Sequence, residues 1–241
     1  MLYPTGGFDP GREGAKANAV APSVFFAGCR RMRTIVYVDG FNFYYAAVKD
    51  TPYKWLDFAA MLRALLQPHH LVTGIKYFTA PVSGKRDPQQ PLRQQTYWRA
   101  LKATTPTLDI IPGRFLTHEV MAPLARPNAG QSRFAAILKT EEKGSDVNLA
   151  VHLLNDAWLG QYDCAVVVSN DSDLAEAMRL VRTHHPGLRL GLVFARTQGG
   201  RPSYELSQHA HFVLRVSQTV LAACQLPNPV PGTNLRKPSN W

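Results

Sequence analysis

The chain has 241 residues, of which 45% are hydrophobic, and its formal net charge is +10. This length and composition indicate one large or two small globular domains. The positive charge favours a polyanionic partner such as nucleic acid, with a merely soluble basic surface as the alternative. No apolar run reaches the roughly 18 residues of a membrane span, so we expect no membrane partner.

The three cysteines, Cys29, Cys164 and Cys224, lie far apart and form no CxxC pair. This spacing indicates neither a zinc site nor a disulfide framework. A reduced, cytoplasmic location fits such cysteine usage best.

Residues 1–31 are rich in Gly, Pro and Ala and show no sustained hydrophobic period. We expect a disordered N-terminal arm that contributes nothing to the core. Met32 stands directly before the first strong strand pattern and is an alternative start of the protein.

The first predicted strand, Thr34–Val38, ends at the sequence Asp39-Gly40-Phe41-Asn42, so a carboxylate stands at the end of a strand. Helical periodicity follows over Leu56–Leu66, and Val72–Thr79 is a second predicted strand. Gly40 permits a turn that a side chain would obstruct, and Asn42 can cap the following helix or bind a ligand.

The middle of the chain adds two helices, one strand and an excursion. The helices are predicted over Leu92–Ala103 and over Gly144–Trp158, and the third strand over Leu108–Ile111. Two further segments, Arg114–Thr117 and Phe134–Thr140, form an excursion joined by a Pro/Gly/Asn loop. In the Gly144–Trp158 helix we expect four residues to face inward, Val147, Ala150, Val151 and Leu154.

The fourth strand, Cys164–Val168, is an apolar run of the kind found in doubly buried parallel strands. It ends at Ser169-Asn170-Asp171-Ser172-Asp173, and a helical pattern follows in Leu174, Ala177, Met178 and Val181. A fifth strand is predicted over Leu188–Phe194 and a sixth over Phe212–Val216. Residues 226–241 are rich in Pro and Asn, which predicts a flexible C-terminal tail.

Strands that alternate with helices predict one α/β domain over residues 32–225, a doubly wound and mainly parallel sheet with helices on both faces. With the strand order 3-2-1-4-5, the first and fourth strands are neighbours at the topological switch point, where ligands bind. Asp39 would then face the same crevice as Asp171 and Asp173. Asp146, in the first turn of a helix, is expected to join them, so that four carboxylates meet in one pocket.

Three of these acids have an alternative explanation: Asp171 or Asp173 as a helix cap, and Asp146 as a charge that favours the helix dipole. A cap explains one member of the Asp171 and Asp173 pair but not both. Two neighbouring carboxylates repel each other, and a divalent cation relieves that repulsion.

Three motifs together resemble the NYN-domain branch of the PIN-like nucleases: VDGFN at 38–42, KGSDVNLA at 143–150 and SNDSD at 169–173. The resemblance spans roughly residues 33–215. It implies a PIN-like α/β fold, an acidic pocket that holds Mg²⁺ or Mn²⁺, and hydrolysis of RNA phosphodiester bonds. The catalytic and metal-binding residues that it implies are Asp39, Asp146, Asp171 and Asp173. The supporting positions are Asn42, Ser169, Asn170 and Lys143.

The residues are consistent with this chemistry without the family name. Hydrolysis of a phosphodiester needs an activated water and compensation of developing negative charge, and carboxylate-bound divalent ions supply both. Oxygen ligands suit Mg²⁺, whereas zinc prefers His or Cys. Phe41, Tyr97 and Trp98 could stack unpaired bases, although we favour core positions for the two ring residues of the Leu92–Ala103 helix.

Other readings are weaker or open. A haloacid-dehalogenase-type phosphatase needs an acid two residues after the first Asp, and Phe41 stands there. There is no GxGxxG after the first strand and no GxxxxGK[ST], which argues against dinucleotide and nucleoside-triphosphate binding. A nucleic-acid-binding module with a vestigial pocket stays an alternative. The sequence does not decide between RNA and single-stranded DNA as partner, or between monomer and homodimer.

Overall fold

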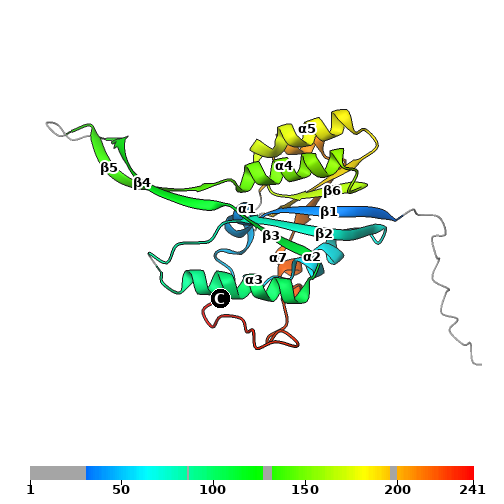
Figure 1. The fold of residues 1–241 in the computed structure, drawn as a ribbon, viewed down its shortest axis with the longest axis horizontal. Helices are drawn as coiled ribbons and strands as arrows, with labels where there is room; N and C mark the ends of the chain where they lie inside the picture. The colour runs from blue at the N-terminus through cyan, green and yellow to red at the C-terminus, as the bar shows by residue number, and fades with distance from the viewer. Residues whose placement is uncertain (1–30, 86, 127–131, 196–199) are drawn as a thin grey trace, which may run out of the picture.

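The computed structural model describes residues 31–85, 87–126, 132–195 and 200–241, so the predicted arm at 1–31 lies outside the described residues except for Arg31. Its main sheet has six strands, all paired in parallel, and Figure 1 shows helices on both sides of it. In spatial order the strands are β3 (Leu108–Pro112), β2 (His70–Thr79), β1 (Met32–Asp39), β6 (Cys164–Val168), β7 (Arg189–Ala195) and β8 (Phe212–Val216). The predicted order 3-2-1-4-5 is confirmed, and the sixth strand extends it.

The side chains of β1 alternate between two hydrophobic cores, as the two-residue period of a strand requires. Val36 and Val38 pack into the core beneath one layer of helices, and Ile35 and Tyr37 pack into the core on the opposite face. The first layer contains α1 (Gly40–Phe43), the π-helix η1 (Tyr44–Val48), α2 (Phe58–Leu65), α3 (Gln90–Thr104) and α7 (Gln218–Ala223). The second contains α4 (Ser145–Trp158), the short 3-10 helix η2 (Ser172–Leu174), α5 (Ala175–His184) and α6 (Tyr204–His209).

A buried polar cluster ties α4 to the sheet. The Asp156 carboxylate accepts hydrogen bonds from the Tyr37 hydroxyl and the Lys76 ammonium, both at 2.6 Å. Asp156 is buried, so removing either partner would leave a charged group poorly compensated. Because β1 and β2 supply the partners, this cluster fixes the position of the helix that carries Asp146.

The buried face of α4 differs in part from the one that we predicted. Ala150 and Leu154 are partly buried against the core as expected, whereas Val147 is 66% exposed and Val151 is 56% exposed. The fully buried positions of the helix are Leu149, Leu153 and Ala157. The inward positions therefore recur at the expected helical spacing, but the helix is rotated about its axis so that the Asp156 carboxylate points to the sheet. In α5, by contrast, Ala177, Met178 and Val181 are buried as predicted.

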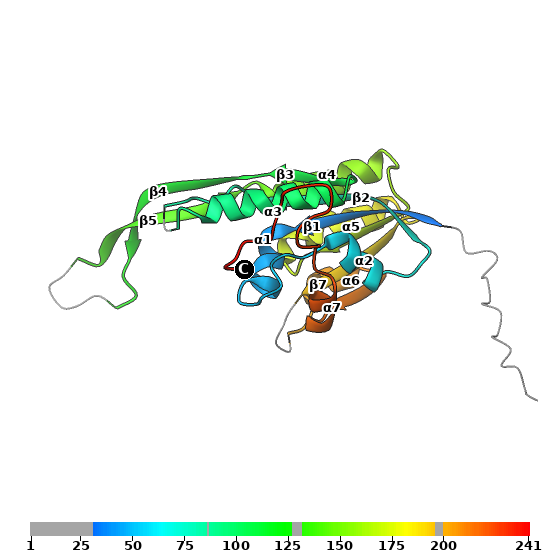
Figure 2. The ribbon, with the colours of Figure 1, turned by 90° about the horizontal axis from the view of Figure 1, so that it is seen from below.

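The predicted excursion is a long two-stranded antiparallel ribbon of β4 (Arg114–Pro123) and β5 (Phe134–Lys143). Figures 1 and 2 show it extending away from the body of the molecule. Its base leads directly into α4, which begins two residues after β5 ends.

The C-terminal segment 226–241, which composition predicts to be flexible, packs against the first helical layer (Figure 1). Leu226 and Val230 are buried, and the ring of Trp241 lies 6.3 Å from that of Trp55. The amide of Leu226 donates a hydrogen bond to the Trp55 carbonyl at 2.8 Å. The prediction is corrected because a few apolar residues, spaced among prolines, find partners that are distant in sequence.

None of the helices within the described residues is both long and apolar enough to cross a membrane.

Candidate active site

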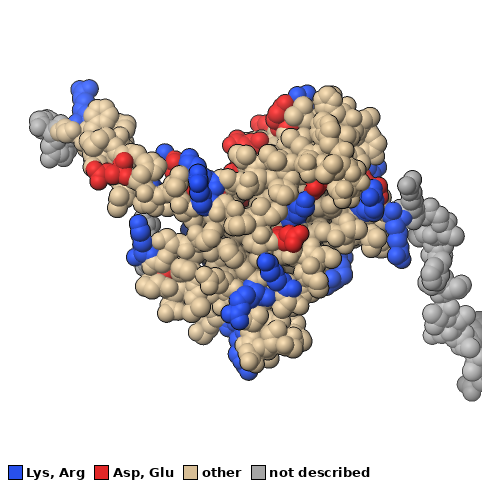
Figure 3. All heavy atoms as spheres, viewed as in Figure 1, with Lys and Arg blue, Asp and Glu red and all other residues tan. Residues whose placement is uncertain are grey.

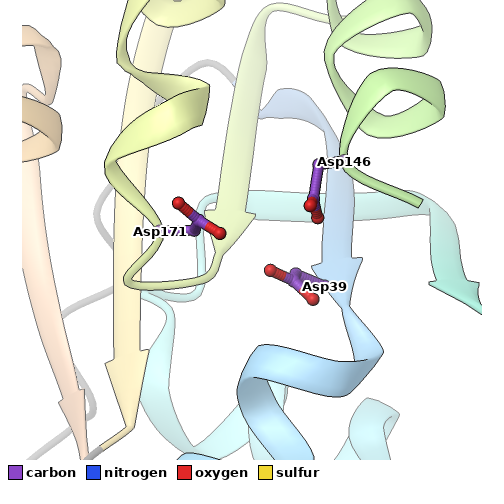
Figure 4. A group of neighbouring side chains, drawn as sticks. All are labelled: Asp39, Asp146 and Asp171. Carbon is purple, nitrogen blue, oxygen red and sulfur yellow. The ribbon is translucent and has the colours of Figure 1, made fainter. Parts of the chain in front are cut away.

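Three carboxylates meet at the carboxyl-terminal edge of the sheet. Asp39, Asp146 and Asp171 each offer one oxygen, and these oxygens lie within 4.8 Å of one another. Figure 4 shows the three side chains pointing toward a common centre from the end of β1, the start of α4 and the loop after β6. Strands β1 and β6 are hydrogen-bonded neighbours, and this pairing brings together residues separated by more than one hundred positions.

Asp39 is held by both of its carboxylate oxygens. Its Oδ1 accepts the backbone N–H of Asn42 at 3.0 Å, which caps α1, and its Oδ2 accepts the Ser169 hydroxyl at 2.8 Å. Gly40 follows directly, where a Cβ atom would lie 2.7 Å from the carbonyl oxygen of Phe78. The chain can therefore turn this sharply into α1 only because residue 40 has no side chain.

Asp171 and Asp146 reach the cluster from helix starts. Asp171 caps η2 by accepting the Asp173 backbone N–H at 3.0 Å, so capping and participation in the cluster occur in the same residue. Asp146 lies in the first turn of α4, after Gly144, whose φ of 102° is a left-handed conformation that favours glycine. No described residue donates a hydrogen bond to the Asp146 carboxylate, which leaves its oxygens available to a ligand.

Asp173 and Lys143 lie outside this arrangement. Asp173 is exposed and does not belong to the three-carboxylate group, although its charge acts on Asp146 through space. Lys143 forms an ion pair with Glu141, with 3.0 Å between its Nζ and Glu141 Oε2. Strand alternation puts both of these residues on the face of β5 opposite to Glu142.

The supporting polar residues connect the loops around the cluster. Ser169 accepts the Asp171 amide at 3.1 Å while it donates to Asp39. Asn42 Oδ1 accepts the Asn170 amide at 3.0 Å, and Asn170 Oδ1 accepts the Ser203 amide at 2.6 Å. These bonds fix the loop after β6 against α1 and α6, and so fix the position of Asp171.

Glu142 is a fourth acid at the site that the sequence analysis did not select. Its Oε1 accepts the backbone N–H of Ser145 at 3.1 Å and the Ser145 hydroxyl at 2.7 Å. Its charge raises the pKa of both Asp39 and Asp146. The sequence does indicate an acid at this place, because an acidic pair stands immediately before the KGSD motif. Side chains alternate between the two faces of a strand, so one acid of the pair has to face inward.

The concentration of negative charge changes the acidity of the site. Burial, followed by the charges of Asp39 and Asp171, raises the pKa of Asp146 to about 6. Burial also raises the pKa of Asp39, and the hydrogen bonds from Asn42 and Ser169 counteract this in part. Binding of either a proton or a cation therefore stabilises the cluster.

This acidity predicts how stability without metal depends on pH. Folded Asp146 binds a proton at a pKa of about 6, whereas the unfolded chain binds it near the ordinary value of 3.8. Between these values the folded state holds more protons, so the contribution of Asp146 to the unfolding free energy rises as the pH falls. Urea unfolding in chelator at about pH 7 and about pH 5 measures this contribution as the difference between wild type and Asp146→Asn. An equal pH response in the two proteins would contradict the prediction.

The carboxylates line an open cleft of about 1100 Å³. Asn42, Asn170 and Glu142 contribute further oxygen atoms to its wall, and Lys49 contributes a positive charge. The Lys49 ammonium lies 5.0 Å from the centre of the Tyr45 ring, which lines the same cleft. The cleft therefore offers both anionic oxygens and a cation to a charged substrate.

The donor set fits a hard divalent cation. All three atoms of the cluster are carboxylate oxygens, and neither His nor Cys belongs to it within the part of the chain that the structure describes. Mg²⁺ and Mn²⁺ prefer such oxygen ligands, whereas zinc and copper prefer nitrogen or sulfur. The unpartnered Asp146 carboxylate and the raised pKa values are the features that a bound cation would compensate.

Comparison with known proteins identifies the family of the chain. Residues 33–214 match the model of the NYN domain family. The chain is also 34% identical over 236 residues to a protein of Pseudomonas putida named 6-hydroxy-3-succinoylpyridine 3-monooxygenase HspA, with 87% of this chain and 75% of that protein aligned. A solved structure of a protein of unknown function from Vibrio parahaemolyticus is 15% identical, with a TM-score of 0.49 over 78% of this chain and 95% of that one.

The family match covers the whole interval in which the three motifs occur, and the sheet has the predicted topology. The resemblance found in the sequence is thereby confirmed. The chain belongs to the NYN domain family.

Proposed function

We propose that the protein is a metal-dependent nuclease that hydrolyses RNA phosphodiester bonds at the three-carboxylate cluster. The observation that carries this proposal is the convergence of Asp39, Asp146 and Asp171 within 4.8 Å, in a chain of the NYN domain family. The family suggests a nuclease, and the net charge of +10 suits a polyanionic substrate.

In this proposal the three carboxylates bind Mg²⁺ or Mn²⁺. When bound, such an ion supplies Lewis-acid activation of water and compensates negative charge at the phosphate. Ser169 and the Asn42 amide orient Asp39, and the Asp173 amide orients Asp171, so the ligands are held before the ion arrives. Lys49, in the same cleft, is placed to attract a substrate phosphate.

The experiment is an incubation of purified protein with labelled single-stranded RNA and DNA in the presence of Mn²⁺, Mg²⁺ or a chelator. Cleavage that requires the metal supports the nuclease. Binding of nucleic acid without cleavage under any of these conditions would overturn it in favour of the vestigial binding module.

A second candidate is oxygenation of a small pyridine compound, which the printed name of the Pseudomonas putida relative favours. A monooxygenase reaction consumes dioxygen and two electrons from a donor. The same preparation is therefore tested with 6-hydroxy-3-succinoylpyridine, a reduced nicotinamide and a flavin, with substrate loss followed by chromatography. Consumption that depends on the protein would support this candidate against the nuclease.

We further propose that the protein forms a homodimer through the β4–β5 ribbon. Leu138 is 75% exposed and Met121 is 63% exposed on the outer half of this ribbon, and an isolated two-stranded ribbon is marginally stable in water. Helix α4 exposes Val147 and Val151, so one chain carries two apolar surfaces that can pair reciprocally with a second copy.

The substitution Leu138→Lys is expected to convert a dimer into a monomer, measured as particle mass by light scattering. The ribbon itself should survive, because residue 138 lies directly opposite Glu119 and a lysine there adds an opposite-charge pair. Leu71→Lys, at an exposed position of β2, is the matched control and should leave the mass unchanged. A wild-type protein that is monomeric at all concentrations would contradict this prediction.

A further inference from the structure

A second cavity, of about 340 Å³, adjoins the acidic cleft. Phe41 and Tyr45 line both, so the two spaces meet at these rings. The volume lies in the range of pockets that hold small organic groups. Its wall combines α1, η1 and α3 with the C-terminal segment through Trp241.

Nine of the twenty residues that line this cavity are aromatic. Tyr97 is part of the core, since it is buried and its hydroxyl donates to the Leu56 carbonyl at 2.8 Å. Trp98 is partly exposed and Tyr45 is 63% exposed, and both rings line the cavity. The cavity therefore presents aromatic surface that the core does not cover.

Positively charged side chains lie in and beside the part of the cavity that adjoins a third hollow. Arg93 and Asn240 line both this cavity and the third hollow, to which Arg236 contributes. Arg93 forms an ion pair with Asp87, whereas none of the described acids forms an ion pair with Arg236 or with Lys54, another residue of the cavity wall. On the face seen in Figure 3, Lys and Arg side chains gather over the region that α3 and the C-terminal segment occupy in Figure 1.

We propose that the acidic cleft, the aromatic cavity and the third hollow together bind a single-stranded segment of nucleic acid, with one unpaired base in the aromatic cavity. In this arrangement the carboxylates of the cleft face the scissile phosphate, the aromatic rings of the cavity contact a base, and the cations of the third hollow contact a flanking phosphate. Stacking on aromatic rings requires a base whose face is free. In a duplex the bases stack on one another, so we expect no duplex base to enter the cavity. This inference rests on the proposed nuclease function for the identity of the strand, but it concerns binding and not cleavage.

The test measures binding in a chelator, where cleavage does not interfere. Fluorescence anisotropy of a labelled short single-stranded RNA is compared between wild type and Tyr45→Ala. Loss of one base–aromatic stack costs about 1–3 kcal/mol, so binding is expected to weaken by about fivefold to 150-fold. Tyr204→Ala is the matched control, because Tyr204 is 73% exposed and lies on α6, outside the residues that line the cavity.

Arg236→Gln provides a second measurement that a local packing defect would not reproduce. If this side chain contacts a phosphate, the slope of the logarithm of the binding constant against the logarithm of the salt concentration becomes less steep by about one. Duplex RNA of the same sequence is expected to bind equally to wild type and Tyr45→Ala.

Three outcomes would overturn the proposal. One is unchanged affinity of Tyr45→Ala for single-stranded RNA, and another is an equal effect of Tyr204→Ala. The third is Tyr45-dependent binding of a pyridine carboxylic acid, seen by tryptophan fluorescence, with no such binding of RNA. Tyr45-dependent RNA binding without any metal-dependent cleavage would support the cavity while contradicting the nuclease, so the two failures are distinguishable.

Discussion

Replacing Asp171 with asparagine is expected to lower metal-dependent RNA cleavage by a factor on the order of one hundred or more. The substitution removes an anionic ligand from the three-carboxylate cluster. The fold should tolerate it, because the amide oxygen of asparagine can still accept the Asp173 N–H that closes the turn. Without metal, stability should stay level or rise, since one source of repulsion on Asp39 and Asp146 is removed.

Thermal unfolding with and without Mn²⁺ separates loss of the ion from loss of the fold. Wild type should gain about 2.7 kcal/mol when the metal is present at a hundred times its dissociation constant, and Asp171→Asn should gain less. Asp109→Asn is the control, because Asp109 is an exposed carboxylate on β3, away from the cluster. A wild-type protein that shows neither a metal-induced shift nor cleavage would leave capping as the only role of Asp171.

Removing residues 226–241 is expected to destabilise the protein strongly, although this segment has no regular secondary structure. Leu226 and Val230 are both almost completely buried, and full burial of such a side chain contributes about 1.5–3 kcal/mol. The truncated chain should therefore lose about 3–6 kcal/mol, which is a large fraction of the stability of a typical domain. The melting temperature should fall by about 6–24 °C, measured by calorimetry or circular dichroism.

Point substitutions distinguish packing from a general effect of truncation. Val230→Ala should cost about 1–3 kcal/mol, because it removes methyl groups from a filled site. Asn234→Ala, at an exposed position in the same segment, should change stability by less than about 0.5 kcal/mol. If the truncated protein melts at the wild-type temperature, the segment does not stabilise the domain in solution.

The strands and the topology could be predicted from the sequence to a large extent. Cys164–Val168 is completely buried, which agrees with its apolar run, and Asp39 and Asp171 follow the two central strands as expected. The predicted order placed these strands side by side, so the meeting of the two carboxylates was also predictable. Asp146 joined them because the KGSD motif begins a helix at the same edge of the sheet.

Other parts of the site could not be predicted. The paired acids after β6 looked equivalent, yet Asp171 joins the cluster and Asp173 is exposed. Their difference depends on the turn of η2, which the Ser169 hydroxyl and the Asp173 amide stabilise. Glu142 was missed because strand alternation indicates only that one acid of the pair faces inward, and the connection of β5 to Ser145 of α4 decides which one.

Elements with a local cause could be read from the residues alone: the apolar strands, the amphipathic pattern of α5 and the carboxylates at strand ends. The rotation of α4 depends on contacts between elements, because the buried Asp156 carboxylate has to reach Tyr37 and Lys76. The packing of residues 226–241 on Trp55 and Tyr97, where they form a wall of the aromatic cavity, likewise depends on residues distant in sequence. Periodicity shows which face of an element is apolar, whereas burial depends on partners that the chain brings together only when it folds.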